Sequence, residues 1–172
     1  MTRKTILALG AVTLIAGSVA VAKGKGILYP DWSKPQGTYQ APVAELGQKP
    51  SADSPWTVTT ITSAIDKPLK GKPVTAVGEV VDISCYLQVG KHGEKHRDCG
   101  QKCVRNGQPA GLLLSDGTLY MLIDEEHDPR RDGLTTLRQQ LVDHMAHVVK
   151  VNGTYSEVEG QKALYVQGTV KN

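Results

Sequence analysis

The sequence contains no phenylalanine, and only 5% of its residues are aromatic. Surfaces that bind single-stranded nucleic acids stack successive bases on aromatic side chains, so such a surface is not expected here. The formal net charge is only +3, and much of this excess lies in the first third of the chain. Because binding to nucleic acid also depends on a basic surface, no nucleic-acid partner is expected.

The sequence also lacks the motifs of common enzyme classes. It has no Walker loop, no Gly-x-Gly-x-x-Gly between a strand and a helix, and no nucleophile elbow around a serine. No two of its three cysteines form Cys-x-x-Cys. This excludes the attachment motif of a c-type haem and disfavours ordinary thiol-redox catalysis. No motif identifies an enzyme, and a non-catalytic role is expected.

The chain begins with a basic start and an uncharged apolar run. Arg3 and Lys4 precede the run, which ends on the small-residue pattern Ala20-Val21-Ala22. Residues 1–22 therefore have the pattern of a secretory signal peptide, with cleavage before Lys23. The run is at the lower length limit for a membrane-spanning helix, so an uncleaved N-terminal membrane anchor is the alternative. Both interpretations predict a periplasmic or other extracytoplasmic domain, secreted or tethered to the inner membrane.

Residues 23–56 are predicted to form a linker or extended arm. Prolines occur in it too closely for a regular element, at Pro30, Pro35, Pro42, Pro50 and Pro55. Apolar pieces such as Ile27-Leu28-Tyr29 interrupt the polar residues, and they either fold back on the domain or order on binding a partner. The partner we expect is a larger membrane-associated complex, or the membrane itself if the leader is uncleaved.

Residues 57–172 are long enough for one domain with its own core. β-Branched runs predict strands at 58–65 and 74–83. Two apolar runs, 111–115 and 118–123, flank Asp116-Gly117, which predicts a hairpin with a two-residue type I′ turn.

A helix and a second hairpin are predicted to complete the domain. Leucines recur at helical spacing after Asp132, which is placed to cap the N-terminus of one helix. Strands at 147–155 and 162–170 are then expected around a turn at Glu159-Gly160.

This order of a long strand, hairpin, helix and hairpin resembles the oligonucleotide/oligosaccharide-binding fold, or OB-fold, from Pro73 to about Val170. The resemblance implies a five-stranded Greek-key barrel with one helix between strands 3 and 4. It implies no particular function, because this fold hosts many unrelated activities. Residues 78–117 are also similar to small secreted bacterial domains, from which no catalytic residue carries over.

All three cysteines fall in an insertion at residues 85–103. His96, Cys99 and Cys103 are spaced three and four residues apart, so on a helical turn their side chains share one face. Cys85 is predicted at the end of the long first strand, and a loop that returns through a short helix would bring all four residues together. Three thiolates and one imidazole suit tetrahedral Zn²⁺ and leave no position for water, which predicts a structural zinc site.

A disulfide is the main alternative to the metal, because exported proteins fold where thiols pair. Cys85 with Cys99 or Cys103 would form one bridge and leave one thiol free. The odd number of cysteines favours joint use in a metal site. His92 could replace His96 as a ligand, although the glycines around it predict a mobile, solvated turn.

Three functions follow from these features. The first is a non-catalytic extracytoplasmic binding or accessory module with a structural metal site, serving as a subunit of a membrane-associated assembly. The second is a periplasmic thiol-redox or metal-handling protein in which Cys99 and Cys103 react or pass on an ion. The third is a disulfide-stapled OB module that binds an oligosaccharide or nucleic acid. Solvent access to the sulfurs distinguishes the first two.

Cleavage of the leader is directly testable. The intact mass of the exported protein is expected to correspond to a chain that begins at Lys23, because a signal peptidase recognises the small residues at 20–22. A mature protein that retains residues 1–22 and stays in the membrane after a salt wash would establish the anchor instead.

Overall fold

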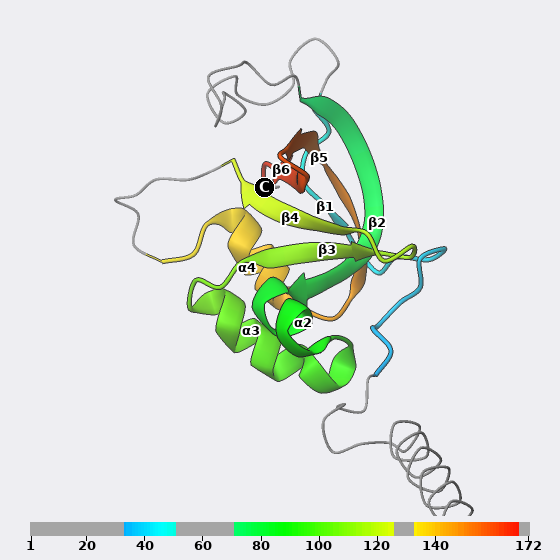
Figure 1. Cartoon of the computed structure of the whole chain (residues 1–172), viewed down its shortest axis with the longest axis vertical. Helices are drawn as coiled ribbons and strands as arrows, with labels where there is room; N and C mark the ends of the chain where they lie inside the picture. The colour runs from blue at the N-terminus through cyan, green and yellow to red at the C-terminus, as the bar shows by residue number, and fades with distance from the viewer. Residues whose placement is uncertain (1–32, 51–70, 126–132, 169–172) are drawn as a thin grey trace, which may run out of the picture. The chain divides into compact units, whose positions relative to one another are not determined.

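Five strands close into a mixed barrel in the part of the chain that this computed structural model describes, residues 33–50, 71–125 and 133–168 (Figure 1). The barrel strands are β2 (Lys72–Asp82), β3 (Ala110–Leu114), β4 (Leu119–Asp124), β5 (Val148–Val158) and β6 (Gln161–Val166). β2 pairs antiparallel with β3 and β5, and β3 pairs antiparallel with β4. β4 pairs parallel with β6, and antiparallel pairing of β6 with β5 closes the barrel. The prediction of a mainly β fold with a five-stranded barrel is confirmed.

The core of the barrel consists of branched aliphatic side chains. Val80, Leu112, Val149, Val151 and Leu164 are fully buried in it. Burial of each such side chain contributes about 1.5–3 kcal/mol relative to exposure. The absence of phenylalanine therefore leaves no gap, because valine and leucine fill the barrel and also favour the strand conformation.

Both predicted hairpins are present, but their turns differ. Glu159 and Gly160 have φ angles of 50° and 81°, as a two-residue type I′ turn requires. In the β3–β4 hairpin only Gly117 has a positive φ, at 84°. Gly117 N donates to Leu114 O at 3.1 Å, and Leu114 N donates to Thr118 O at 2.8 Å. The loop therefore has three residues, and the prediction of a two-residue type I′ turn at Asp116-Gly117 was wrong.

The reason for this difference is the side chain of Asp116. Its carboxylate accepts a hydrogen bond from Thr118 N at 2.9 Å, two residues farther along the chain. Such local bonds from aspartate stabilise a turn in which the aspartate itself keeps a negative φ, and the glycine that follows supplies the left-handed conformation.

Three α-helices are present in the described residues, where the OB-like prediction had one between strands 3 and 4. That one is α4 (Thr136–Asp143), between β4 and β5. Its N-cap is Thr135, whose hydroxyl accepts a hydrogen bond from Arg138 N at 3.2 Å. The sequence had predicted Asp132 as the cap. The other two, α2 (Ile83–Val89) and α3 (Arg97–Arg105), lie with the short 3₁₀ helix η1 (Glu94–His96) in the β2–β3 connection. α2 spans only two turns, too short for a periodic pattern to show in the sequence.

Part of the predicted arm packs on the barrel. β1 (Glu45–Leu46) pairs parallel with β5, and the side chain of Leu46 is only 2% exposed. Gln36 also forms a bridge with His147 just before β5. Residues 33–50 thus belong to the folded unit. The leader, the rest of the arm and the strand predicted at 58–65 lie outside the described residues.

No helix within the described ranges is long and apolar enough to cross a lipid bilayer.

The turn at Gly117 allows a test of the hairpin geometry. A Cβ atom at Gly117 would meet nothing within 4 Å, so a substitution there costs only backbone strain from the positive φ. We expect Gly117→Val to lower the free energy of unfolding by roughly 1 kcal/mol or more. Gly117→Asn is the matched control and should cost much less, because asparagine tolerates the left-handed region. Denaturant melts measure both, and equal midpoints for the two variants would contradict the assigned turn.

Candidate metal centre

The centre begins where β2 ends and α2 begins. Asp82 is the last residue of β2 and the N-cap of α2, and its Oδ1 accepts a hydrogen bond from Ser84 N at 2.9 Å. This cap satisfies one of the unpaired amides at the start of the helix. Cys85 consequently lies in the first turn of α2, and not at the end of the strand as predicted. α2 then ends at Gly90, whose φ of 68° reverses the chain.

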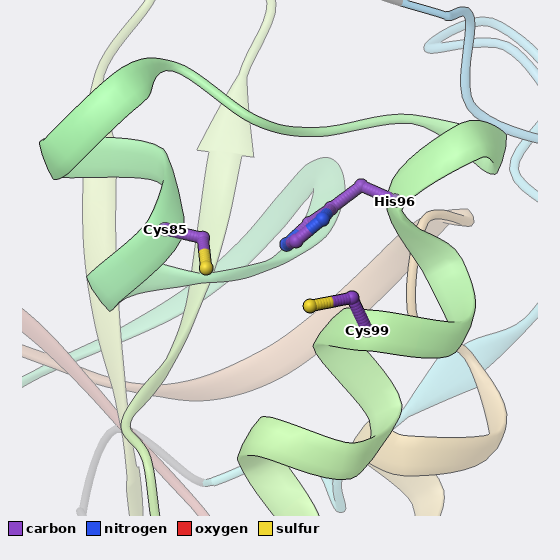
Figure 2. Close-up of side chains that lie close together, drawn as sticks. All are labelled: Cys85, His96 and Cys99. Carbon is purple, nitrogen blue, oxygen red and sulfur yellow. The ribbon is translucent and has the colours of Figure 1, made fainter. Parts of the chain in front are cut away.

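The second side of the centre is formed by η1 and α3. His96 is the last residue of η1, and Cys99 and Cys103 lie on α3, as the spacing of three and four residues predicted. Gly100 lets α3 approach Met145 closely, since a Cβ at this glycine would lie 2.8 Å from the Met145 sulfur. Figure 2 shows the side chain of Cys85, from α2, pointing toward those of His96 and Cys99, from η1 and α3.

The cluster consists of two overlapping groups of potential ligands. In the first, which we call the outer group, the ligand atoms of Cys85, His96 and Cys99 all lie within 4.8 Å of one another. In the second, the inner group, the same is true of Asp82, Cys85 and Cys103. The four residues predicted from the sequence are thus brought together around Cys85, and with Asp82 they lie close enough to hold a metal ion.

Asp82 is the one candidate ligand that was not predicted. The signal for it in the sequence is the position of an aspartate at the end of a β-branched strand and three residues before a cysteine. That position equally indicates an ordinary helix cap, and the structure shows that the carboxylate is a cap through one oxygen only.

Each group contains a buried polar atom that lacks a hydrogen-bond partner. His96 is 8% exposed and Asp82 is fully buried. Nε2 of His96, in the outer group, and Oδ2 of Asp82, in the inner group, have no partner. An unsatisfied buried atom of this kind costs about 1–3 kcal/mol, and more if it is charged. Both atoms are metal-ligand types, so a cation bound at either group would remove the cost of the unsatisfied atom in that group, and the donor set fits a metal ion.

The electrostatics of the thiols depend on burial and on Asp82. Burial raises the pKa of Cys85, and the neighbouring Asp82 carboxylate raises it further. The same two causes, in the same order, raise the pKa of Cys103 to about 12. Burial lowers the pKa of His96. Without a cation the thiols of Cys85 and Cys103 are therefore protonated and the His96 imidazole is neutral at neutral pH. A bound metal ion would deprotonate the thiols and release protons.

The loop that carries His96 is held by a buried carboxylate on β2. Glu79 is 1% exposed, and its Oε1 accepts from Gly93 N at 2.6 Å. Its Oε2 lies 2.9 Å from Nδ1 of His92. His92, predicted to be solvated or to replace His96, is instead tied to the barrel through Nδ1. Burial raises the pKa of Glu79, while its bonds to His92 and Gly93 oppose that rise.

The arm holds the same loop from the other side. Oγ of Ser33 accepts a hydrogen bond from Lys95 N at 2.7 Å. A Cβ at Gly93 would lie 1.9 Å from Ser33 O, and the φ of this glycine is 78°, so no other residue fits there. These contacts hold the backbone between α2 and η1, and His96 with it.

All three cysteines are free thiols in this structure, and they differ in exposure. Cys99 is exposed to solvent, whereas Cys85 and Cys103 are half-buried. Because Cys85 lies within 4.8 Å of both other sulfurs, a disulfide from Cys85 to either one remains the alternative to a metal.

The described residues bring three thiols, a buried imidazole and a buried carboxylate together where the insertion leaves β2. No family model, no curated protein and no solved structure matches the chain.

Proposed function

We propose that this chain is a non-catalytic extracytoplasmic binding or accessory module whose insertion is fixed by zinc bound through Cys85, His96, Cys99 and Cys103. The observation that carries the proposal is the convergence of these ligands around buried atoms that lack partners. Thiolate and imidazole ligands together select Zn²⁺ among the common divalent ions, whereas Mg²⁺ and Ca²⁺ prefer oxygen.

The ion would act by joining α2 to α3, which supply its ligands from two sides. α3 is fastened to α4 through Gln101, whose Nε2 donates to Val142 O at 2.9 Å. α2 continues directly from β2 and is the other side of the centre. A metal ion between α2 and α3 therefore couples β2 to α4 through the insertion. In such sites the free energy of metal binding becomes free energy of local folding.

The barrel connectivity supports the OB-fold proposal. Around the barrel the order is β2-β3-β4-β6-β5, with α4 between the third and fourth barrel strands along the chain. This is the arrangement expected of a five-stranded Greek-key barrel of that kind. The metal-bearing insertion then occupies the connection between the first two barrel strands, a frequent position for ligand-binding loops in this fold.

Export and a membrane-associated partner are part of the proposal. They rest on residues 1–22, a signal peptide or anchor, and on the Pro-rich segment 23–56. Since residues 33–50 pack on the barrel, the parts of the arm proposed for a larger assembly are residues 23–32 and 51–56. The packed part would transmit that attachment to the loop of His96 through Ser33.

Metal analysis of the exported protein tests the proposal. We expect the purified protein to contain zinc, and chelation to lower its thermal midpoint, because the insertion loses its central link. Cys85→Ser should lose the metal, since Cys85 belongs to both groups. The matched control is Leu87→Ser on the same helix, a residue that is 69% exposed and should leave the metal content unchanged.

The disulfide alternative gives a different result. It predicts a metal-free protein that titrates a single free thiol, and His96→Ala would then retain full stability. That combination would overturn the zinc proposal.

A metal-handling function is the second candidate, and the exposure of Cys99 favours it. A purely structural zinc site is usually closed, whereas an exposed thiolate offers an incoming ligand direct access to the ion. The ion could then be passed to a partner without unfolding of the insertion.

The kinetics of zinc removal distinguish the two candidates. For a metal-handling site, the rate of zinc transfer to a coloured chelator should rise in proportion to chelator concentration, because the chelator attacks the ion in place. For a closed structural site, the rate should be slow and independent of chelator concentration, because local opening limits it. Leu87→Ser serves as the control. Because Leu87 is exposed and is not a ligand, this variant should release zinc at the rate of the wild type.

A further inference from the structure

We propose that the centre holds two soft divalent ions, one in the outer group and one in the inner group, with the Cys85 thiolate bridging them. The inference rests on the proposed metal binding and assigns Asp82 as a ligand. It also assigns the class of ion, since a site of three thiolates, one imidazole and one carboxylate suits Zn²⁺ or a similar thiophilic ion.

The distances between the ligand atoms favour two ion positions over one. Ligands of one tetrahedral zinc ion lie about 2.0–2.3 Å from the metal and therefore all within about 3.3–3.8 Å of one another. In the described ranges, the sets of mutually close metal-ligand atoms contain three members each and overlap only at Cys85. His96 and Cys103 fall in different sets. Two three-ligand positions with a shared sulfur use only atoms that already lie within 4.8 Å of one another, whereas one four-ligand site would also have to bring His96 and Cys103 together.

The buried atoms without hydrogen-bond partners also favour two ion positions. The outer group contains Nε2 of His96 and the inner group contains Oδ2 of Asp82, and both are buried. An ion in the outer group satisfies only the first, and an ion in the inner group only the second. Two ions would satisfy both, in keeping with the tendency of buried polar atoms to have partners.

Charge balance is consistent with two ions. With both bound, the three thiolates and the Asp82 carboxylate carry four negative charges, which the two divalent cations balance. Burying uncompensated charge is costly, and Asp82 is fully buried. Lys91 lies near enough to act electrostatically on Cys85, but it is exposed to solvent, which screens its charge.

The shared ligand is chemically suited to this role. A thiolate sulfur has several lone pairs and can bind two ions at once, which an imidazole nitrogen cannot. Cys85 is also the one member of the cluster on α2, opposite the two cysteines of α3. Each ion would then have three protein ligands, leaving one position for water or an incoming ligand. This openness agrees with the exposure of Cys99.

Titration of the reduced, processed protein with Zn²⁺ and with Co²⁺ tests the inference. We expect two ions per wild-type chain, and two ¹¹³Cd resonances when Cd²⁺ is used as the probe. Cys99→Ser and His96→Ala should each retain one ion, held by the inner group. Cys103→Ser and Asp82→Asn should also retain one, held by the outer group. Lys102→Ser, an exposed residue of α3, is the control and should retain two.

Asp82→Asn is the decisive variant, because asparagine caps a helix as well as aspartate does and the fold is preserved. One ion per wild-type chain, unchanged in Asp82→Asn but lost in all four cysteine and histidine variants, would overturn the second ion and leave the proposed zinc site standing. A protein that binds no ion at all would overturn both. Circular dichroism of each variant ensures that a lost ion reflects a lost ligand and not an unfolded chain.

Discussion

The organisation of the centre depends on the burial of one carboxylate at a junction. Asp82 closes β2 and opens α2, so its backbone is constrained on both sides: β2 is paired with β3 and β5, and the helix begins immediately afterwards. One carboxylate oxygen caps the helix, and the other is buried without a hydrogen-bond partner. A nearby cation would stabilise a buried carboxylate held in this way. The thiols of Cys85 and Cys103 beside it are the groups through which a metal ion would be held there.

Hydrogen bonds to the barrel, the arm and α4 hold the rest of the insertion in place. Glu79 holds the loop of His92 and Gly93 against the barrel, and Ser33 of the arm holds it from the other side. On the far side of α3, Arg138 of α4 donates to Val104 O at 3.0 Å. These contacts help to hold His96 and both cysteines of α3 in place. Preorganised ligands lose little conformational entropy on binding, so the geometry favours a specific ion site over a loose collection of thiols.

Much of the barrel could be predicted from the sequence because strand and hairpin signals are local. β-Branched runs and left-handed turn residues indicate each strand wherever the chain lies in space. The turn at Asp116 was misjudged because a side-chain bond to Thr118 competes with the backbone pattern, and two residues of sequence do not reveal which bond forms. α2 was missed because seven residues carry no visible periodicity, and its cap is also the last residue of a strand.

The candidate site, like the barrel, could be predicted from the sequence only in part. The sequence by itself indicated that Cys99 and Cys103 share one face of a helix, with His96 one turn before Cys99, because a helix places residues three and four apart together whatever surrounds it. It also determined the chemical class of the ligands, since residue types are independent of the fold. Only the tertiary structure decided that Asp82 is buried beside Cys103, that Cys85 stands between two groups of ligands, and that His92 is bound to Glu79. These relations join residues on different elements, and their distances depend on how α2, α3 and the barrel pack, which no local spacing encodes.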